Sequence, residues 1–381
     1  MSAVYLDHAA TSPILPEVLQ VMQETEQHYF GNASSIHRFG RDARHQIEHS
    51  RMILAESIGA KEREIVFTSG GTEAVNLAII GTALRRKEKG RHIVTTAIEH
   101  HAVLRACKFL ETVGFDVTYV PVNEQGVVRS EDVLAAVRED TILVSVMLVN
   151  NEIGTRQPVS KIGKALQGTD VLLHTDAVQA YGMLRLHVNE LYVDLLSVSA
   201  HKMNGPKGIG FLYVKEGVSI SPILFGGEQE NKRRAGTENV AGIVGFQKAV
   251  EYSQITLEKR RAQYASFRTK MLDIFREHEI SFIVNGETED TMPHILNVSF
   301  PNTTSEALLV RLDLAGVAAS SGSACTAGTL EPSHVLQVMF GENKERVQSA
   351  IRFSFGVGNT LEEIETAAYE TVQAVKQMTG R

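Results

Sequence analysis

The sequence of 381 residues is poor in several features that mark particular classes of protein. It contains no tryptophan, two cysteines and 9 prolines. Two cysteines cannot form the disulfide framework of a small secreted domain, and they favour a protein with reduced thiols in the cytoplasm. The formal net charge of -7 gives no sign of the basic excess that binds nucleic acid, so we expect no direct nucleic-acid partner.

Long apolar runs are missing as well. No uninterrupted apolar stretch approaches the ~18 residues of a membrane-spanning helix. The first residues, MSAVYLD, do not combine a charged region with an apolar core as a secretory signal does. We therefore expect a cytoplasmic protein without a membrane partner. Its length and its 43% of hydrophobic residues suffice for about two domains of ~150 residues or more.

Short runs rich in β-branched residues alternate with amphipathic stretches in the first part of the chain. The strands expected from this pattern cover residues 65–67, 92–96, 117–120, 141–147, 171–174, 195–199 and 210–214. The alternation predicts an α/β fold with a mostly parallel central sheet flanked by helices. Ligands of such sheets bind beyond the carboxyl ends of the strands.

The last third of the chain has a different pattern. A charged helix is expected at residues 256–278, followed by strands at residues 282–284, 295–300 and 351–355 and by helices at residues 305–315 and 361–378. This mixture predicts a smaller α+β domain. The predicted division is a large domain at residues 13–255 and a small domain at residues 256–381, which also includes residues 1–12.

Two polar segments after predicted strands could hold parts of a ligand. The segment TSGGTE at residues 68–73 could cradle a phosphate with its glycine and helix N-terminal amides, or it could simply cap the next helix. The segment HTDAVQ at residues 174–179 sets Asp176 just past a buried strand. A buried carboxylate there could pair with a protonated ring nitrogen, and a helix cap is the alternative.

Two further segments offer lysine and histidine side chains. The segment SAHKMNGPKG at residues 199–208 places Lys202 at a strand end, where a desolvated amine can hold an aldehyde as a Schiff base. A solvated loop lysine is the ordinary alternative, and we expect Lys207 to be one. The segment EHH at residues 99–101 offers an imidazole that could stack on a flat ring or carry protons, although a structural loop histidine is more common.

The two cysteines lie in contrasting surroundings. Cys325 belongs to the segment SSGSACTAG at residues 320–328, whose small residues cannot build a core. A displayed thiol reacts as its thiolate, so we expect Cys325 to be a nucleophile. Cys107 belongs to the segment VLRACKFL at residues 103–110, and it is predicted to pack from a helix against the core.

The order of these segments along the chain points to one family. The chain presents a phosphate loop, a histidine that could stack, an aspartate and a lysine in that order. This order is similar to that in fold-type I pyridoxal-phosphate enzymes. Over nearly its whole length the chain resembles the NifS/IscS-type cysteine desulfurases of the class V aminotransferase family. The motifs that carry this resemblance are LDHAATS (6–12), TSGGTE (68–73), VNNEIG (149–154), SAHK (199–202), RAGTEN (234–239) and SGSAC (321–325).

The resemblance implies the fold of a fold-type I pyridoxal-phosphate-dependent transferase, with pyridoxal 5'-phosphate as cofactor. Lys202 would hold the cofactor, Asp176 would pair with its ring nitrogen, Gln179 would bond its ring hydroxyl and His100 would stack on its ring. The complete set of cofactor-binding residues that the resemblance implies is Gly71, Thr72, His100, Asn151, Asp176, Gln179, Ser199, His201, Lys202 and Thr237. Thr237 would come from a second subunit, so a homodimer is expected. Asn151 and Arg352 would bind the substrate carboxylate.

The same resemblance implies a reaction and its partners. Lys202, His100 and Cys325 would be catalytic, converting L-cysteine to L-alanine and leaving a persulfide on Cys325. A sulfur-acceptor protein would take that sulfur for iron–sulfur cluster assembly or tRNA thiolation. No resident metal is expected, although Cys325 could be a transient ligand of an iron–sulfur cluster. A selenocysteine lyase or a pyridoxal-phosphate aminotransferase is the alternative, and a non-catalytic binding protein is a rival of another class.

Overall fold

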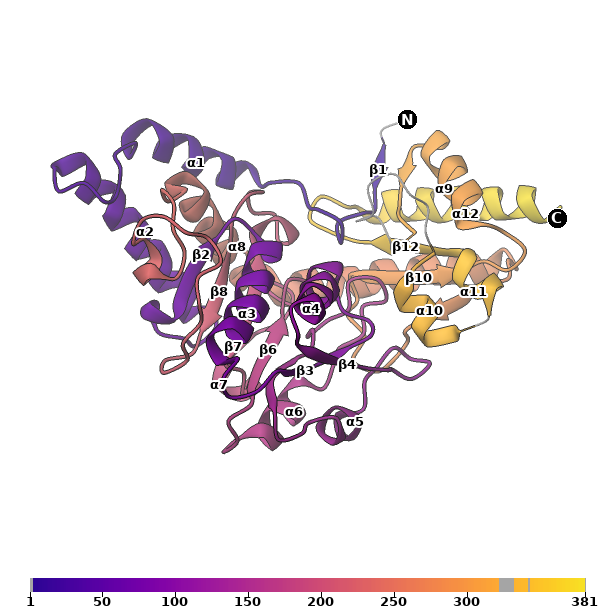
Figure 1. The fold of residues 1–381 in the computed structure, drawn as a ribbon. Coiled ribbons are helices and arrows are strands. Elements are labelled where there is room, and N and C mark those ends of the chain that lie inside the picture. Colours follow the sequence, from indigo (N-terminus) through magenta and orange to yellow (C-terminus); the bar gives the residue numbers. More distant parts are fainter. Residues whose placement is uncertain (1–2, 322–331, 342, 381) are drawn as a thin grey trace.

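Seven runs of apolar and β-branched residues form one central sheet in the computed structural model, which describes residues 3–321, 332–341 and 343–380 (Figure 1). The strands are β2 (Ile65–Thr68), β3 (His92–Thr96), β4 (Asp116–Val120), β5 (Thr141–Ser145), β6 (Leu172–Asp176), β7 (Leu195–Ser199) and β8 (Gly210–Val214), in the order β2-β8-β7-β6-β5-β3-β4. Only β8 runs antiparallel to its neighbours, β2 and β7. The predicted mostly parallel sheet is therefore confirmed.

Helices cover both faces of this sheet, which explains why its inner strands are apolar on both sides. One face packs against α3 (Gly71–Arg86) and α4 (His101–Thr112). The core on the other face includes side chains of α2 (Arg38–Glu56), α6 (Val159–Leu166), α7 (Val188–Leu191) and the long helix α8 (Val240–Glu277). The remaining elements of this part are α1 (Pro16–His28), α5 (Ser130–Ala135) and the short helices η1 (Glu62–Glu64), η2 (Ala200–Lys202) and η3 (Glu230–Lys232).

The start of α8 differs from the prediction. The helix begins at Val240, whereas the sequence pattern predicted a start near residue 256, so the predicted domain boundary falls inside a continuous helix. Gly242 and Gly245 weaken the helical signal of this stretch. Gly245 allows α8 to pack closely against α1, because a Cβ on Gly245 would lie only 2.7 Å from Met22 Cγ in α1. Asn239 caps the helix by accepting the N–H of Gly242.

The last part of the chain forms a second group of elements, seen at the right of Figure 1. The strands β9 (Ile283–Asn285), β10 (Ile295–Ser299) and β12 (Ala350–Ser354) make an antiparallel sheet in the order β12-β10-β9. Around it lie α9 (Ser305–Leu314), α10 (His334–Phe340), α11 (Lys344–Gln348) and α12 (Leu361–Thr379). The strands and the main helices of this region agree with the sequence pattern to within a few residues.

The N-terminal segment joins this second group before it reaches the large sheet. β1 (Val4–Tyr5) pairs in parallel with β11 (Val317–Ala318), and Asp7 bridges to Ser354 of β12. Beyond Asp7 the chain turns toward the carboxyl ends of the central strands and then continues into α1. In the part of the chain that the structure describes, no helix is long and apolar enough to cross a membrane.

Candidate active site

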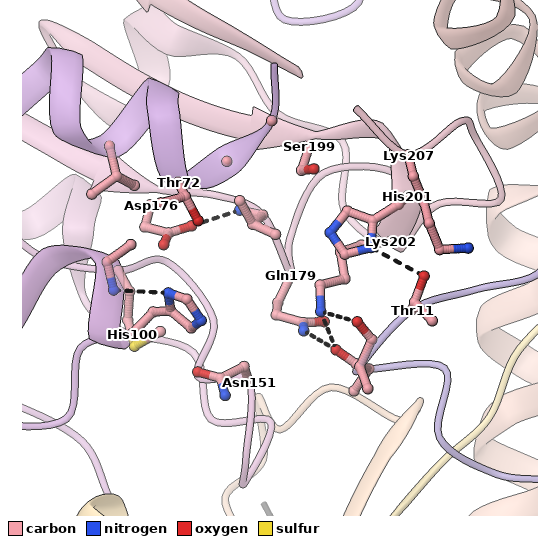
Figure 2. A pocket seen from close by; sticks show the side chains of 18 of the residues that line it. Thr11, Thr72, His100, Asn151, Asp176, Gln179, Ser199, His201, Lys202 and Lys207 are labelled. Atoms are coloured by element: carbon pink, nitrogen blue, oxygen red, sulfur yellow. Dashed lines mark hydrogen bonds between the residues drawn. The ribbon is translucent and has the colours of Figure 1, made fainter. Parts of the chain in front are cut away.

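A cavity of about 460 Å³ lies beside the carboxyl ends of β3, β5, β6 and β7. Figure 2 shows His100, Asn151, Asp176, Gln179 and Lys202 arranged around the same space. The predicted site residues that line the cavity are Gly71, Thr72, His100, Asn151, Asp176, Gln179, Ser199, His201, Lys202 and Arg352. Residues far apart in the sequence thus meet where an α/β sheet ordinarily binds its ligand.

One end of the cavity is formed by the turn from β2 into α3. The helix begins at Gly71, so the first amide groups of α3 have no partner within the helix and can bind an anion. The backbone passes close to its neighbours here, because a Cβ on Gly71 would lie 2.9 Å from Val178 Cγ2. Ser199 at the end of β7 and the hydroxyl of Thr72 also line the cavity. This end suits a phosphate group.

His201 and Lys207 stand near the same end. The Nδ1 atom of His201 lies 3.2 Å from Thr11 Oγ1. Burial and, to a smaller extent, the charge of Lys202 lower the pKa of His201 to about 4, so the ring is neutral at physiological pH. Lys207 is exposed at the rim of the cavity, which fits the predicted solvated lysine.

Asp176 is the last residue of β6 and is almost completely buried. Its Oδ1 atom accepts the N–H of Val178 at 2.9 Å. Burial raises the pKa of Asp176 to about 6, while the Val178 N–H and the positive charge of Lys202 oppose the rise. A protonated ring nitrogen placed against this carboxyl group would stabilise its ionised form.

Lys202 follows β7 at the end of the short helix η2. Its Nζ atom donates to the backbone oxygens of Ala9 at 2.5 Å and Ala10 at 2.6 Å. Gln179 donates from Nε2 to the same Ala9 oxygen at 2.9 Å, as Figure 2 shows. The amine is therefore held inside the cavity by the N-terminal turn, a contact that the sequence did not reveal.

His100 caps the first turn of α4. Its Nδ1 atom accepts the N–H of Ala102 at 3.1 Å, so the neutral ring carries its proton on Nε2. Burial, followed by the charge of Lys202, lowers the pKa of His100 to about 4, which keeps the ring neutral. The preceding residue, Glu99, is fully buried and accepts the hydroxyl of Thr96 at 2.7 Å and the N–H of Met147 at 2.9 Å.

Arg352 reaches the cavity from β12 of the small sheet. Its Nη1 atom donates to the backbone oxygen of Asn151 at 2.9 Å, and its Nη2 atom donates to Asp7 Oδ1 at 2.8 Å. Asn151 and Arg352, which were both expected to bind the substrate carboxylate, are therefore neighbours in the structure. Asp7 was not assigned a role from the sequence, and neither were the other residues of its turn. Their only sequence signal is the small and polar run LDHAATS at residues 6–12.

Thr237 is the predicted site residue of the described structure that does not line this cavity. Thr237 is exposed on the loop after η3 and lines a separate cavity of about 80 Å³, together with Ser69 and Arg234. Its expected place in the site of a second subunit concerns a chain that is not present. Cys325 lies outside the described residues. Cys107 is buried in α4, where burial raises the pKa of its thiol to about 12, as suits a packing residue.

The donors and acceptors of the cavity fit one kind of ligand. Amides at the start of α3 suit a phosphate, the carboxyl group of Asp176 suits a basic ring, and the amine of Lys202 suits an aldehyde. Pyridoxal phosphate combines these three groups. Among residues 3–321, 332–341 and 343–380, no group of three or more His, Cys, Asp or Glu side chains could hold a metal ion.

Comparisons with known proteins give the same family. Residues 4–366 match the class V aminotransferases. A protein of Bacillus subtilis (strain 168) named "Putative cysteine desulfurase IscS 1" is 55% identical over 379 residues, covering 100% of both chains. Cysteine desulfurase IscS of Dictyoglomus turgidum is 46% identical over 361 residues, which are 95% of this chain and 91% of that protein.

Solved structures extend the likeness to the fold. A NifS-like protein superposes with a TM-score of 0.91 and 36% identity, covering 97% of this chain and 98% of its own. The structure of SspA in complex with cysteine gives a TM-score of 0.81 and 35% identity, covering 92% and 98% of the two chains. The chain belongs to the class V aminotransferase family, and within that family it is a pyridoxal-phosphate-dependent cysteine desulfurase.

Proposed function

We propose that the described cavity binds pyridoxal phosphate and L-cysteine through the residues that line it. Gly71, Thr72, Ser199 and His201 hold the phosphate, and Thr237 of a second copy of this chain completes its binding. Asp176 faces the ring nitrogen, Gln179 the ring hydroxyl, and His100 the face of the ring. The observation that carries this proposal is the presence of Lys202, Asp176 and Arg352 on the wall of one cavity.

Different residues of the cavity bind the substrate and transfer its protons in this proposal. Bound pyridoxal phosphate supplies an electron sink next to the substrate Cα. Arg352 and Asn151 hold the substrate carboxylate, and Lys202 takes the Cα proton. His100, neutral and with its proton on Nε2, can donate a hydrogen bond to the substrate.

Cys325 accepts the sulfur in this proposal. Its thiolate forms an S–S bond with the substrate sulfur while the Cβ–S bond of the substrate breaks. The electron pair of the broken bond stays with the substrate carbon, which is protonated to give alanine. The persulfide on Cys325 then passes its outer sulfur to an acceptor protein, either an iron–sulfur scaffold or an enzyme of tRNA thiolation.

A homodimer in the cytoplasm is the assembly that we propose. Large apolar side chains are exposed on the loop before α2 and on the segment between β8 and η3, with Ile36 92% and Phe225 88% exposed. Phe30 and Phe39, also exposed, pack on one another with ring centroids 5.2 Å apart. A second copy that covered these side chains would remove them from water and could bring Thr237 to the neighbouring cavity.

Single-turnover assays test the chemical part of this proposal. Wild-type enzyme mixed with L-cysteine should give alanine and protein-bound persulfide in equal amounts. Cys325→Ala should form neither, whereas Cys107→Ala is the matched thiol control and should form both. Lys202→Ala should lose the absorbance band near ~420 nm that marks the bound cofactor.

The alternatives give different outcomes in the same assays. An aminotransferase would keep its activity in Cys325→Ala, since it needs no thiol, and a selenocysteine lyase would prefer selenocysteine. Alanine formed without persulfide would overturn the assignment of Cys325. A pull-down with the persulfide-loaded enzyme would identify the acceptor, and sedimentation analysis would test the dimer.

A further inference from the structure

The guanidinium of Arg352 is almost completely buried, with only 2% of the residue exposed. Its backbone is fixed by pairing with β10 and by two hydrogen bonds exchanged with Ser320, of 2.6 and 3.1 Å. A buried guanidinium is costly unless an anion pairs with it. Within the described residues, Asp7 is the carboxylate that pairs with Arg352, at 2.8 Å.

The backbone fixes Asp7 independently of this ion pair. Leu6 donates to the backbone oxygen of Ala318 at 2.8 Å and accepts the N–H of Ser354 at 2.7 Å, so this segment is held between β11 and β12. The backbone oxygen of Asp7 then accepts the N–H of Ala10 at 3.0 Å and the hydroxyl of Tyr5 at 3.1 Å. The carboxylate of Asp7 is therefore presented to Arg352 by a rigid turn.

Asp7 stands behind Arg352 as seen from the cavity. Arg352 lines the cavity and Asp7 does not. Asp7 and the Asn151 oxygen each take one N–H of the guanidinium, on Nη2 and Nη1 respectively. The Nε atom is buried without a hydrogen-bond partner in the described structure. A guanidinium has five N–H groups, so one N–H on each Nη atom is left for the two oxygens of a carboxylate.

The same turn also holds Lys202 through the backbone oxygens of Ala9 and Ala10. One short segment thus contacts both residues that an amino acid substrate would meet, Arg352 at its carboxylate and Lys202 near its amino group. Segments with this double contact set the spacing between two binding groups.

We propose that Asp7 is a positioning residue that orients Arg352 and thereby makes the enzyme select substrates with an α-carboxylate. This inference rests on the proposed role of Arg352 as the carboxylate-binding residue. Asp7 keeps the buried guanidinium paired in the free enzyme and fixes the plane in which it meets the substrate. Loss of the carboxylate would leave the backbone oxygen of Asn151 as the remaining acceptor of the Arg352 guanidinium among the described residues, so the guanidinium would lose one of the two contacts that orient it.

Spectral titration of the holoenzyme tests this inference with two ligands. L-cysteine has an α-carboxylate, and cysteamine has the same amine and thiol without it. In Asp7→Ala the apparent dissociation constant for L-cysteine should rise about tenfold or more, as expected for loss of a charge-assisted hydrogen bond. The constant for cysteamine should stay within about twofold, because the amine and thiol contacts do not involve Arg352.

Steady-state kinetics and a conservative variant sharpen the test. The KM for L-cysteine should rise in Asp7→Ala while kcat changes less than about threefold. Asp7→Asn keeps an oxygen acceptor without the charge, so its KM for L-cysteine should lie between the values of the wild type and Asp7→Ala. Asp170→Asn, at an exposed carboxylate that pairs with Lys89, is the matched control and should change neither ligand constant.

Three outcomes separate the inference from the function on which it rests. Equal weakening of L-cysteine and cysteamine in both Asp7 variants would show a general structural role and overturn the inference. Arg352→Ala should itself abolish the preference for L-cysteine over cysteamine, and failure to do so would overturn the proposed role of Arg352. Loss of that preference in Arg352→Ala but not in the Asp7 variants would overturn the role of Asp7 alone.

Discussion

Removal of the Glu230 side chain should destabilise the protein, because Glu230 completes a buried ion pair that holds the loop carrying Thr237. Nη1 and Nη2 of Arg51 donate to the two Glu230 oxygens at 2.7 and 2.8 Å, and the N–H of Phe67 in β2 donates to one of them at 2.9 Å. The two charged side chains are only 9% and 4% exposed. Glu230 and the next two residues have φ values of 48°, 55° and 66°, so the pair stabilises a strained loop.

The magnitude follows from the contacts that Glu230→Ala would remove. Breaking a buried pair by removing one partner costs about 3–5 kcal/mol. Arg51 would keep Glu48 and the Ile65 oxygen, each at 3.0 Å, which favours the lower end of this range. With an unfolding entropy of about 2.1 cal/mol/K per residue, the 381 residues give roughly 0.8 kcal/mol/K. The expected fall in Tm is therefore about 4 °C.

Calorimetry of Glu230→Ala, Arg51→Met and the double variant Arg51→Met/Glu230→Leu, at one protein concentration, measures this effect. The double variant removes both buried charges, but it also removes the acceptor of the Phe67 N–H and the donor to the Ile65 oxygen, so it should cost about 1–3 kcal/mol. Glu228→Ala, at an exposed carboxylate that pairs with Lys232, is the control and should change stability by less than about 0.5 kcal/mol. A fall in Tm below about 1 °C in Glu230→Ala, or a double variant less stable than Glu230→Ala, would refute the reasoning.

Three further predictions concern the site and the central sheet. Burial raises the pKa of Glu99 to about 8 from the usual 4.5, so the folded protein loses stability as pH rises between these two values. Urea unfolding at pH 5, 7 and 9 should show a smaller decline in stability for Glu99→Gln than for the wild type. Burial lowers the pKa of His174 to about 3 from the usual 6.5, so its stabilisation is present above pH 6.5 and is lost as pH falls toward 3. Urea unfolding of His174→Gln at pH 7, 5.5 and 4 should show a shallower acid decline, and an unchanged slope would contradict the assignment. Gly71→Ala places a Cβ 2.9 Å from Val178 Cγ2, so it should reduce the affinity for pyridoxal phosphate about tenfold in a fluorescence titration. Adding Val178→Ala should restore part of this affinity, and an unchanged affinity in Gly71→Ala would contradict the close approach.

The sequence predicted the chemistry best where a polar residue directly follows an apolar strand. Asp176 ends β6, Lys202 follows β7 after two residues, and His100 ends the connection from β3 into α4. Apolar runs locate strand ends to within a few residues, and the parallel topology then brings those ends to one edge. The cavity could be predicted for this reason without any knowledge of side-chain contacts.

The sequence predicted less well where packing overrides local propensity or where another chain takes part. The first two turns of α8 contain Gly242 and Gly245, which reduce helix propensity, yet tertiary contacts with α1 stabilise the helix there. The place of Thr237 depends on a second chain, so neither the sequence pattern nor a single subunit determines it. For such residues the family resemblance was the source of the expectation.

Roles of the main chain are the hardest to read from a sequence, and the N-terminal turn shows why. Lys202 bonds the backbone oxygen of Ala9 across 193 positions of the chain. Every residue has the same backbone oxygen, so alanine at this position gives no chemical signal of its contact. The position of the turn depends instead on Leu6 and Asp7, which pair with β11 and β12. The turn in this way presents the Asp7 carboxylate to Arg352, so Asp7 can influence substrate binding while its side chain stays outside the cavity.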